Sequence, residues 1–144
     1  MATLSNNRGT GGHSANTCVP YLLEEVIDYN TQGAAAADVI EAVNVPAGSL
    51  VLFAGVEVIT ADSAGNSGTL ALGDGTVTYV AATAPTTVGQ IANADAVAEM
   101  CVAYSAANTL DVTGATGTVN GKVRVWAIVM DYTSPDVTQR AVFA

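Results

Sequence analysis

The sequence predicts an all-β domain, and three observations lead to this fold class. Val, Thr and Gly are abundant among the 144 residues, whereas helix-forming polar residues are scarce. About eight stretches have the apolar content and alternation of strands. Clusters of Gly, Asn and Asp separate these stretches as turns do. This pattern favours a two-sheet antiparallel β-sandwich, with a jelly roll as the leading topology.

The chain divides into one domain and two extended arms. Residues 1–18 are rich in Ser, Asn, Gly and Thr and form an N-terminal arm, residues 19–132 form the β-sandwich, and residues 133–144 form a C-terminal tail. A single domain of this size buries roughly 68–70% of its unfolded surface, enough for a core without disulfides. The tail ends in the apolar pair Val142-Phe143, so we expect it to dock on protein.

The first two elements are short and allow more than one interpretation. Residues 19–30 could form a short helix, but the alternation of Tyr21, Leu23 and Ile27 with polar neighbours and the flanking turn residues favour a strand. Residues 34–43 begin with four alanines, which favour helix, and continue into an alternating VIEAV stretch. We expect a helical turn that leads into a strand.

The stretch 44–60 is expected to be the central strand. The turn Pro46-Ala47-Gly48 opens it, and strict alternation puts two sets of side chains on opposite faces. One set is Leu50, Leu52, Ala54, Val56 and Val58, and the other is Val51, Phe53, Gly55, Glu57 and Ile59. Since one face is wholly apolar and the other nearly so, the strand belongs in the middle of a sheet, covered on both sides or against a neighbouring subunit.

The middle of the chain reads as short strands between turns. The predicted strands are 69–72, 76–80, 98–104 and 109–113. Turns and loops connect these strands: a surface loop at 61–68, a tight Gly73-Asp74-Gly75 turn, a long connection at 81–97, a turn at 105–108 and a Gly-rich hairpin loop at 114–121. The long connection has room for one helical turn.

A second buried strand closes the domain at 122–132. Val123, Val125, Ala127 and Val129 share one face, whereas Arg124, Trp126, Ile128 and Met130 share the other. The strand is long enough to pair with the central one. We interpret Trp126, the one tryptophan, as a core anchor in preference to a ligand platform.

The charge balance excludes some classes of partner. Thirteen acidic and four basic residues give a formal charge of −9, which repels the phosphates of DNA and RNA, so no nucleic-acid partner is expected. Only 12% of residues are charged, which suggests that partners cover part of the surface. The longest apolar run contains Gly55 and Glu57 and is too short to span a membrane. With no signal peptide in residues 1–17, we expect the protein to be made and kept in a cytosol until it assembles or the cell lyses.

The sequence offers no supported catalytic, cofactor-binding or metal-binding residues, so we do not expect an enzyme. His13 is the one histidine and lies in the arm. Glu24 and Glu25 point to opposite faces of a strand, against the spacing of a glycosidase pair. Residues 62–66 loosely resemble a calcium loop but lack its acidic density, and an ordinary turn is the better interpretation. The glycines at 73 and 75 form a turn, not a phosphate cradle.

The two cysteines are too few and too distant in sequence for a disulfide framework. Cys101 lies among apolar residues and is predicted to be a small core residue, whereas Cys18 is the last residue of the arm and could be a free thiol.

Four segments together resemble small virion structural proteins of tailed phages, particularly phages of marine bacteria and cyanobacteria. They are ADVIEAVNVPAGSLVLFAGVEVITA (37–61), TLALGDGT (69–76), AYSAANTLDV (103–112) and KVRVWAIVMDY (122–132). In that group a VPAG turn leads a strand, an LGDGT turn follows, and a VRVWA strand closes the domain. The resemblance covers about residues 19–132 and rests on structural turns and strands.

The resemblance implies a β-sandwich decoration, or cement, protein on the capsid surface of the virion. It implies the major capsid protein as partner and self-association into a homotrimer, and it carries over no catalytic residues. Two other hypotheses stay open. One is a carbohydrate-binding module that uses Tyr79 or Tyr104 near Asp111, and the other is a tail, fibre or baseplate component of the same virion.

Overall fold

The computed structural model describes residues 19–32, 37–62, 68–116 and 120–131, and these contain nine strands, one short helix and one 3-10 turn. The strands are β1 (Tyr21–Asp28), β2 (Val39–Val45), β3 (Ser49–Thr60), β4 (Thr69–Gly73), β5 (Thr78–Thr83), β6 (Ile91–Asn93), β7 (Val102–Tyr104), β8 (Asn108–Thr116) and β9 (Lys122–Asp131). The helix α1 (Tyr29–Gln32) follows β1, and the 3-10 turn η1 (Val97–Glu99) precedes β7. The predicted arm and tail lie outside the described residues.

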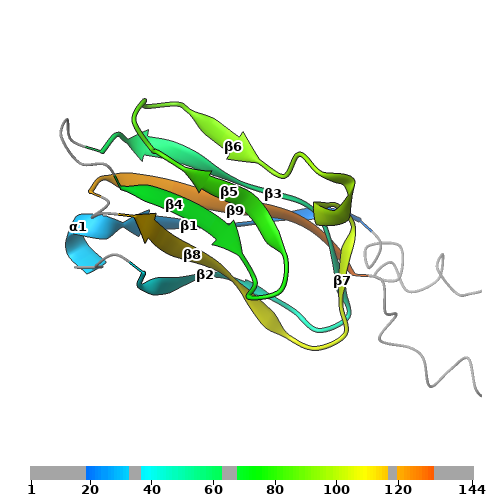
Figure 1. Cartoon of the computed structure of the whole chain (residues 1–144). Coiled ribbons are helices and arrows are strands. Elements are labelled where there is room, and N and C mark those ends of the chain that lie inside the picture. The colour runs from blue at the N-terminus through cyan, green and yellow to red at the C-terminus, as the bar shows by residue number, and fades with distance from the viewer. Residues whose placement is uncertain (1–18, 33–36, 63–67, 117–119, 132–144) are drawn as a thin grey trace, which may run out of the picture.

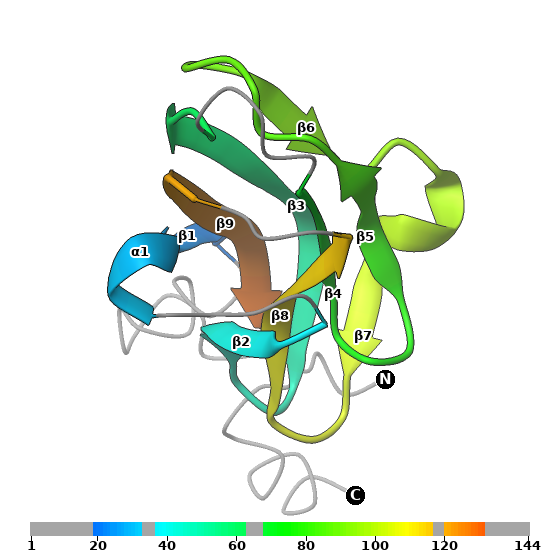
Figure 2. The same cartoon turned by 60° about the vertical axis from the view of Figure 1, so that its left-hand side comes forward.

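The strands form two antiparallel sheets that pack face to face, as Figures 1 and 2 show. Sheet A has the order β1-β9-β3-β6, with the short β7 also paired to β3, and sheet B has the order β2-β8-β4-β5. The predicted all-β sandwich is therefore confirmed.

The strand order is that of a jelly roll. Four antiparallel pairs nest along the chain: β1 with β9, β2 with β8, β3 with β6, and β4 with β5. The chain is thus one long ribbon that is folded over so that successive pairs alternate between the two sheets. The tip of the ribbon is the predicted Gly73-Asp74-Gly75 turn, where Gly75 has a φ of 85° and so takes a conformation that glycine adopts without strain.

As predicted, β3 lies inside sheet A and pairs with β9 along most of its length. The strict alternation predicted for β3 is wrong, however, because the register with β9 shifts between Val51 and Phe53. This bulge adds one residue, so Val51 and Ala54 both face the core. The two predicted faces are corrected accordingly: Leu50 and Leu52 are only partly buried, whereas Val51 is fully buried together with Ala54, Val56 and Val58.

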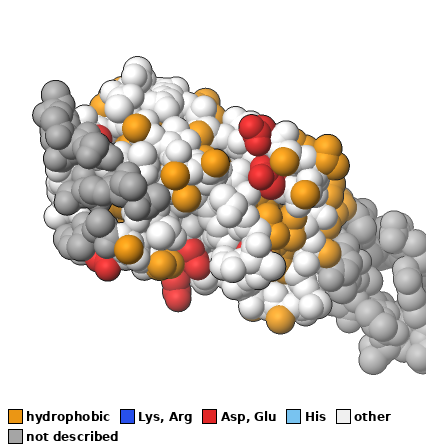
Figure 3. All heavy atoms as spheres, viewed as in Figure 1, with side chains coloured by type: hydrophobic (Ala, Val, Ile, Leu, Met, Phe, Trp, Pro, Cys, Tyr) orange, Lys and Arg blue, Asp and Glu red, His pale blue; other side chains and the backbone are white. Residues whose placement is uncertain are grey.

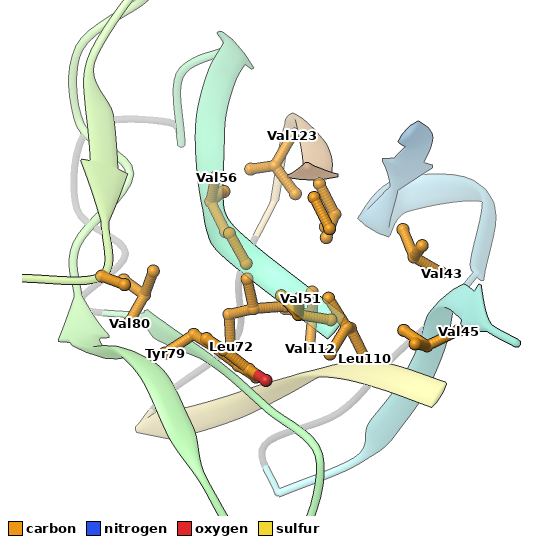
Figure 4. Packing of buried hydrophobic residues seen from close by; sticks show 14 of the residues in the cluster. Val43, Val45, Val51, Val56, Leu72, Tyr79, Val80, Leu110, Val112 and Val123 are labelled. Carbon is orange, nitrogen blue, oxygen red and sulfur yellow. The ribbon is translucent and has the colours of Figure 1, made fainter. Parts of the chain in front are cut away.

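The core lies between the sheets and consists mainly of valine, leucine and tyrosine. Figure 4 shows side chains of both sheets converging on this layer, including Val51 and Val123 from sheet A and Leu72 and Leu110 from sheet B. The four residues that share the inner face of β9 are at most 1% exposed, namely Val123, Val125, Ala127 and Val129. Burying many such side chains is the main favourable contribution to folding.

The strand interpretation of residues 19–30 is confirmed for β1, which ends where α1 begins. The carboxylate of Asp28 accepts hydrogen bonds from the amides of Asn30 and Thr31 at the start of this turn of helix, as helix-capping aspartates do. The predicted helical turn within 34–37 lies largely outside the described residues, and the strand that should follow it is β2.

Four predictions for the middle of the chain are wrong. Residues 98–104 form η1 and the three-residue β7 instead of one strand, and β6 is an unpredicted strand within the long connection. The Gly-rich segment after β8 is not a hairpin loop, because β8 belongs to sheet B and β9 to sheet A. Cys101 is exposed, with a φ of 58°, and not a core residue.

Candidate interaction face

The outer face of sheet A carries large apolar side chains. Because directly paired residues share a face, the register places Leu22, Ile128 and Phe53 in one row across β1, β9 and β3. Trp126 lies beside this row on β9, and the next row joins Met130 to Leu50. We call these six side chains the apolar face: Leu22, Leu50, Phe53, Trp126, Ile128 and Met130. Leu22 is 55% exposed and the other five are partly buried.

Trp126 is therefore on the outside of the sandwich, which corrects its prediction as a core anchor. Its ring lies over Gly55 of the neighbouring strand, and its centroid is 5.8 Å from that of Phe53 with a tilt of 44°. Tilted aromatic pairs at such distances are favourable. Because Gly55 has no side chain, the indole ring can lie directly against the backbone of β3 at the middle of the apolar face.

Charged side chains on this outer face gather at the end near α1. Lys122 Nζ lies 2.9 Å from Asp28 Oδ2, and Arg124 lies 3.4 Å from Glu57 and 4.0 Å from Glu24. The hydrogen bond from Lys122 holds the pKa of Asp28 below its usual value. The two basic residues of the sandwich are thus paired with carboxylates, and the opposite end of the face is left to apolar side chains.

The outer face of sheet B has a different character. Its outward residues on β8 and β4 are small or polar, namely Thr109, Asp111, Thr113, Thr69 and Ala71. Figure 3, which looks onto this side of the molecule, shows a mostly white surface with scattered orange, a larger orange group toward the end where β7 lies, and no blue. Glu41 and Asp111 are direct neighbours across β2 and β8. Like charges directly opposite each other on neighbouring strands are destabilising, and Glu41 is exposed to solvent. The outer face of sheet B therefore has no counterpart of the apolar face on β8 and β4.

A hydrogen-bonded clamp closes the end of sheet A at which β1 begins and β9 ends. The hydroxyl of Tyr21 donates to Asp131 Oδ1 at 2.9 Å, and the hydroxyl of Ser49 donates to the same oxygen at 3.3 Å. Burial, together with the hydrogen bond to Asp131, raises the pKa of Tyr21. The clamp joins β1, β3 and β9, and Figure 1 shows that the start of β1 and the end of β9 lie at the same end of the sandwich.

The tyrosines proposed for a sugar-binding groove are core residues instead. Tyr79 is 1% and Tyr104 is 5% exposed, and their hydroxyls lie 2.7 Å apart. Tyr104 also donates to Asp74 Oδ2 at 2.5 Å, which ties β7 to the ribbon tip. Burial raises the pKa of Tyr79 to about 12. Asp111 lies outward on sheet B, so these three residues do not form the predicted groove.

The remaining predicted candidates are dispersed. Glu24 and Glu25 lie on opposite faces of β1, as predicted, since they pair with Trp126 and Val125. Asp62 accepts a hydrogen bond from the amide of Asn120, while residues 63–66 of the suggested calcium loop lie outside the described residues, as do His13 and Cys18. Within the described ranges no three His, Cys, Asp or Glu residues are grouped to hold a metal. No described helix is long and apolar enough to cross a membrane.

The apolar face was the feature that sequence reasoning undervalued. Its signal was present in β9, where the residues between the inward valines are Trp126, Ile128 and Met130 instead of polar side chains. A strand that is apolar on both faces is covered on both sides in the folded or assembled protein. Only the sheet order shows that no other element of the described chain covers this outer face.

Comparison with solved structures identifies chains of the same fold in three phage capsids. The similarity to a chain in the capsid of Ralstonia phage GP4 has a TM-score of 0.59 at 17% identity and covers 81% of this chain and 86% of that one. The similarity to a chain in the cyanophage Pam1 capsid has a TM-score of 0.57 at 20% identity and covers 78% of this chain and 85% of that one. For a chain in the acid-stable capsid of Helicobacter pylori bacteriophage KHP30, the TM-score is 0.56 at 15% identity, and the alignment covers 77% of this chain and 86% of that one. No family model and no curated protein matches the chain.

Proposed function

We propose that this chain is a virion structural protein of a tailed phage, and specifically a decoration protein that binds the outer surface of the assembled head and stabilises it. In this role it performs no reaction. Each bound copy adds buried contact area at junctions between shell subunits, and the symmetry of the shell repeats this contribution many times.

The fold supports the virion part of the proposal. The three capsids contain chains of the same jelly-roll fold, and the alignments cover similar shares of both partners, which means that the matched chains are about as long as this one. Since a fold by itself carries many functions, the site has to supply the rest of the argument.

The observation that carries the decoration role is the contrast between the two faces of the sandwich. A decoration protein has one side on the shell and one side in water. The apolar face, with Trp126 and Phe53 at its middle, suits a buried contact, because large aromatic side chains are enriched where proteins bind one another. The outer face of sheet B, with Thr109, Asp111 and Thr113, suits solvent.

The partners in this proposal are the major capsid protein and other copies of the chain. Residues 19–132 contain twelve of the thirteen acidic residues and two of the four basic ones, which gives that segment a formal charge of 2 − 12 = −10. Such a surface favours a shell that presents positive or uncharged side chains and disfavours nucleic acid. We further propose that copies of the chain associate as homotrimers, in solution as well as on the shell.

The test is to mix the purified chain with shells that lack a decoration protein. Co-sedimentation of the chain with the shells is expected, together with added density on the outside of the head in a particle reconstruction and a higher temperature of shell disruption. The mass of the free protein, measured by light scattering, tests the trimer. A stable monomer that does not bind shells would sink the proposal, and antibody label on the tail instead of the head would favour a tail component.

A further inference from the structure

We propose that copies of this chain associate through one narrow side of the sandwich, which consists of β5, β6 and the connection 84–90 between them. We call this surface the neutral side. The proposal rests on the self-association in the proposed function and adds the surface at which the copies meet. Three features of the neutral side support it: its lack of charge, its rigidly held apolar side chains and its irregular strand edge.

The sandwich has two sides formed by strand edges, and they differ in charge. Among the described strands, the sheets end in β1 and β2 at one side and in β6 and β5 at the other, as Figures 1 and 2 show. The first side carries Glu24, Glu25 and Asp28 on β1 and Glu41 on β2. Residues 75–94, which include the whole neutral side, form the longest stretch of the chain without a charged residue.

This lack of charge suits contact with a second copy. Around a symmetry axis, groups near the axis lie close to the same groups of the other copies, so a charge there faces an identical charge. The chain has a formal charge of −9, and most of its surface therefore repels a second copy. The neutral side avoids this repulsion. A shell that presents positive side chains would instead favour the acidic parts of the surface.

The neutral side also has a suitable direction. Its strand β6 is an edge of sheet A, the sheet that carries the apolar face, and the edge of a sheet points roughly at a right angle to its face. With the apolar face on the shell, the neutral side points along the shell toward a neighbouring copy. The chain thus uses one surface for the shell and another for its own copies.

Two carboxylates border the neutral side, and both have partners within the chain. Glu57, which lies next to the start of β6, is 3.4 Å from Arg124. Asp62, whose amide donates to the carbonyl oxygen of Pro85, accepts a hydrogen bond from the amide of Asn120 at 3.1 Å. These groups of the same chain hold the two carboxylates, so a second copy does not have to supply partners for them.

The neutral side presents apolar side chains on a rigid backbone. Val88 is 64% and Ile91 is 60% exposed. The amide of Gly89 donates to the carbonyl oxygen of Val58 at 2.8 Å, and the amide of Val58 donates to the carbonyl oxygen of Gln90 at 2.9 Å. These hydrogen bonds fix the connection to β3. A backbone that is already held in place loses little freedom on binding, which favours association.

The edge of β5 favours contact through side chains over pairing of strands. Between Leu70 and Leu72 of β4, the paired residue changes from Thr83 to Val80, so β5 contains one extra residue there. Such a bulge bends the strand, and natural sheets use bulges at their edges to prevent pairing with another chain. Pairing of two β5 strands into one continuous sheet, which would give a dimer, is thus disfavoured. Side-chain packing around a three-fold axis is compatible with the homotrimer.

The experiment measures the mass of the free protein by light scattering and sedimentation velocity. Val88→Asp places a charge on the neutral side and is expected to lower the mass about threefold, from trimer to monomer. Val39→Asp is the matched control, because Val39 is 59% exposed on β2 at the opposite side, and its mass is expected to stay unchanged. Since both side chains are mostly exposed, both variants are expected to keep the fold, which circular dichroism and the thermal midpoint check.

A mixture of two variants tests whether position 88 faces its own copies. Val88→Asp and Val88→Lys are each expected to be monomeric, because the same charge repeats at the contact. In an equal mixture, opposite charges meet there, so a species heavier than the monomer is expected to return. If both variants are folded and their mixture stays monomeric, the proposal is overturned.

Other outcomes would also overturn it. These are a mass of Val88→Asp equal to that of the unsubstituted chain, an equal loss of mass in Val88→Asp and Val39→Asp, and an unsubstituted chain that is monomeric at every concentration. Co-sedimentation with shells tests the decoration role separately. A trimer that Val88→Asp dissociates but that does not bind shells would contradict the decoration role and leave the neutral side as the contact between copies.

Discussion

Gly55 lies directly beneath the indole ring of Trp126, and a Cβ atom built on it would be 2.6 Å from Cζ2 of that ring and 2.8 Å from the carbonyl oxygen of Ala92. The pair joins the two central strands of sheet A on their outer side. The position therefore requires glycine for reasons of space, and the form of the apolar face depends on it.

Gly55→Ala is expected to destabilise the fold by about 1–3 kcal/mol, because the added methyl group has to displace both an aromatic ring and a backbone oxygen. Chemical denaturation followed by Trp126 fluorescence measures the change. In a Trp126→Leu background, followed by circular dichroism, Gly55→Ala should lower the free energy of unfolding by less. The loss should not be zero, because the added methyl group still meets the carbonyl oxygen of Ala92. An unchanged midpoint for Gly55→Ala would show that the ring is free to move away.

The apolar face and the core are expected to respond differently to truncation. Leu72 is 0% exposed, so Leu72→Ala leaves a cavity and should cost about 2–5 kcal/mol of unfolding free energy. Leu22 is 55% exposed, so Leu22→Ala should change stability by no more than about 0.5 kcal/mol. Thermal unfolding of the two variants checks this. Equal costs would mean that Leu22 belongs to the core of the isolated protein.

The hydrogen bond from Tyr104 to Asp74 should contribute more to stability than the hydrogen bond from Tyr21 to Asp131. Tyr104→Phe removes the donor to Asp74 and the partner of the buried Tyr79 hydroxyl, and we expect a loss of about 1.5–3 kcal/mol. Tyr21→Phe removes one hydrogen bond at the more open end of sheet A and should cost about 0.5–1.5 kcal/mol. Urea denaturation ranks the two variants, and the reverse order would contradict this account.

Asp74 should make the fold sensitive to acid. Burial by itself would raise the pKa of this carboxyl group, but hydrogen bonds from the Tyr104 hydroxyl and from the amides of Val77 and Thr76 outweigh burial and hold the pKa below its ordinary value. A group whose folded-state pKa is lowered contributes stability above its unfolded-state pKa of about 3.9 and loses that contribution as the pH falls through the folded-state value.

Asp74→Asn should therefore be less stable than the unsubstituted protein at neutral pH, and the difference should shrink below about pH 4, where the unfolded-state carboxyl group becomes protonated. Unfolding midpoints measured from pH 7 down to the acid limit of the fold give the comparison. A difference that stays constant across this range would assign the loss to geometry instead of charge.

The ion pair between Lys122 and Asp28, at the end of the outer face near α1, should control the pKa of Asp28. Lys122→Gln removes the cation whose hydrogen bond lowers the pKa of Asp28, so that pKa should rise toward its ordinary value, whereas Lys122→Arg should keep it low. Carboxyl chemical shifts followed by NMR against pH measure both variants. A pKa of Asp28 that is the same in all three proteins would assign the shift to the amide of Thr31 instead of Lys122.

Much of the fold could be predicted because it depends on local chemistry. The alternation in β9 and the turn at Gly73-Asp74-Gly75 specify a strand and a ribbon tip wherever they occur. The bulge in β3 was not predictable, because it arises only where Val51 and Phe53 pair with β9. The outward position of Trp126 also escaped prediction, since a strand that is apolar on both sides does not indicate which side faces the second sheet.

By itself, the sequence determined the all-β class, the two long strands β3 and β9, and an acidic surface poor in basic residues, because composition and period are properties of the chain alone. Only the tertiary structure decided that the strands nest as a jelly roll, that Tyr79 and Tyr104 are buried instead of exposed, and that Leu22, Phe53 and Trp126 share one outer face. The reason is physical: which side of a strand meets the core depends on strands distant in sequence, and the chain alone does not state which strands those are.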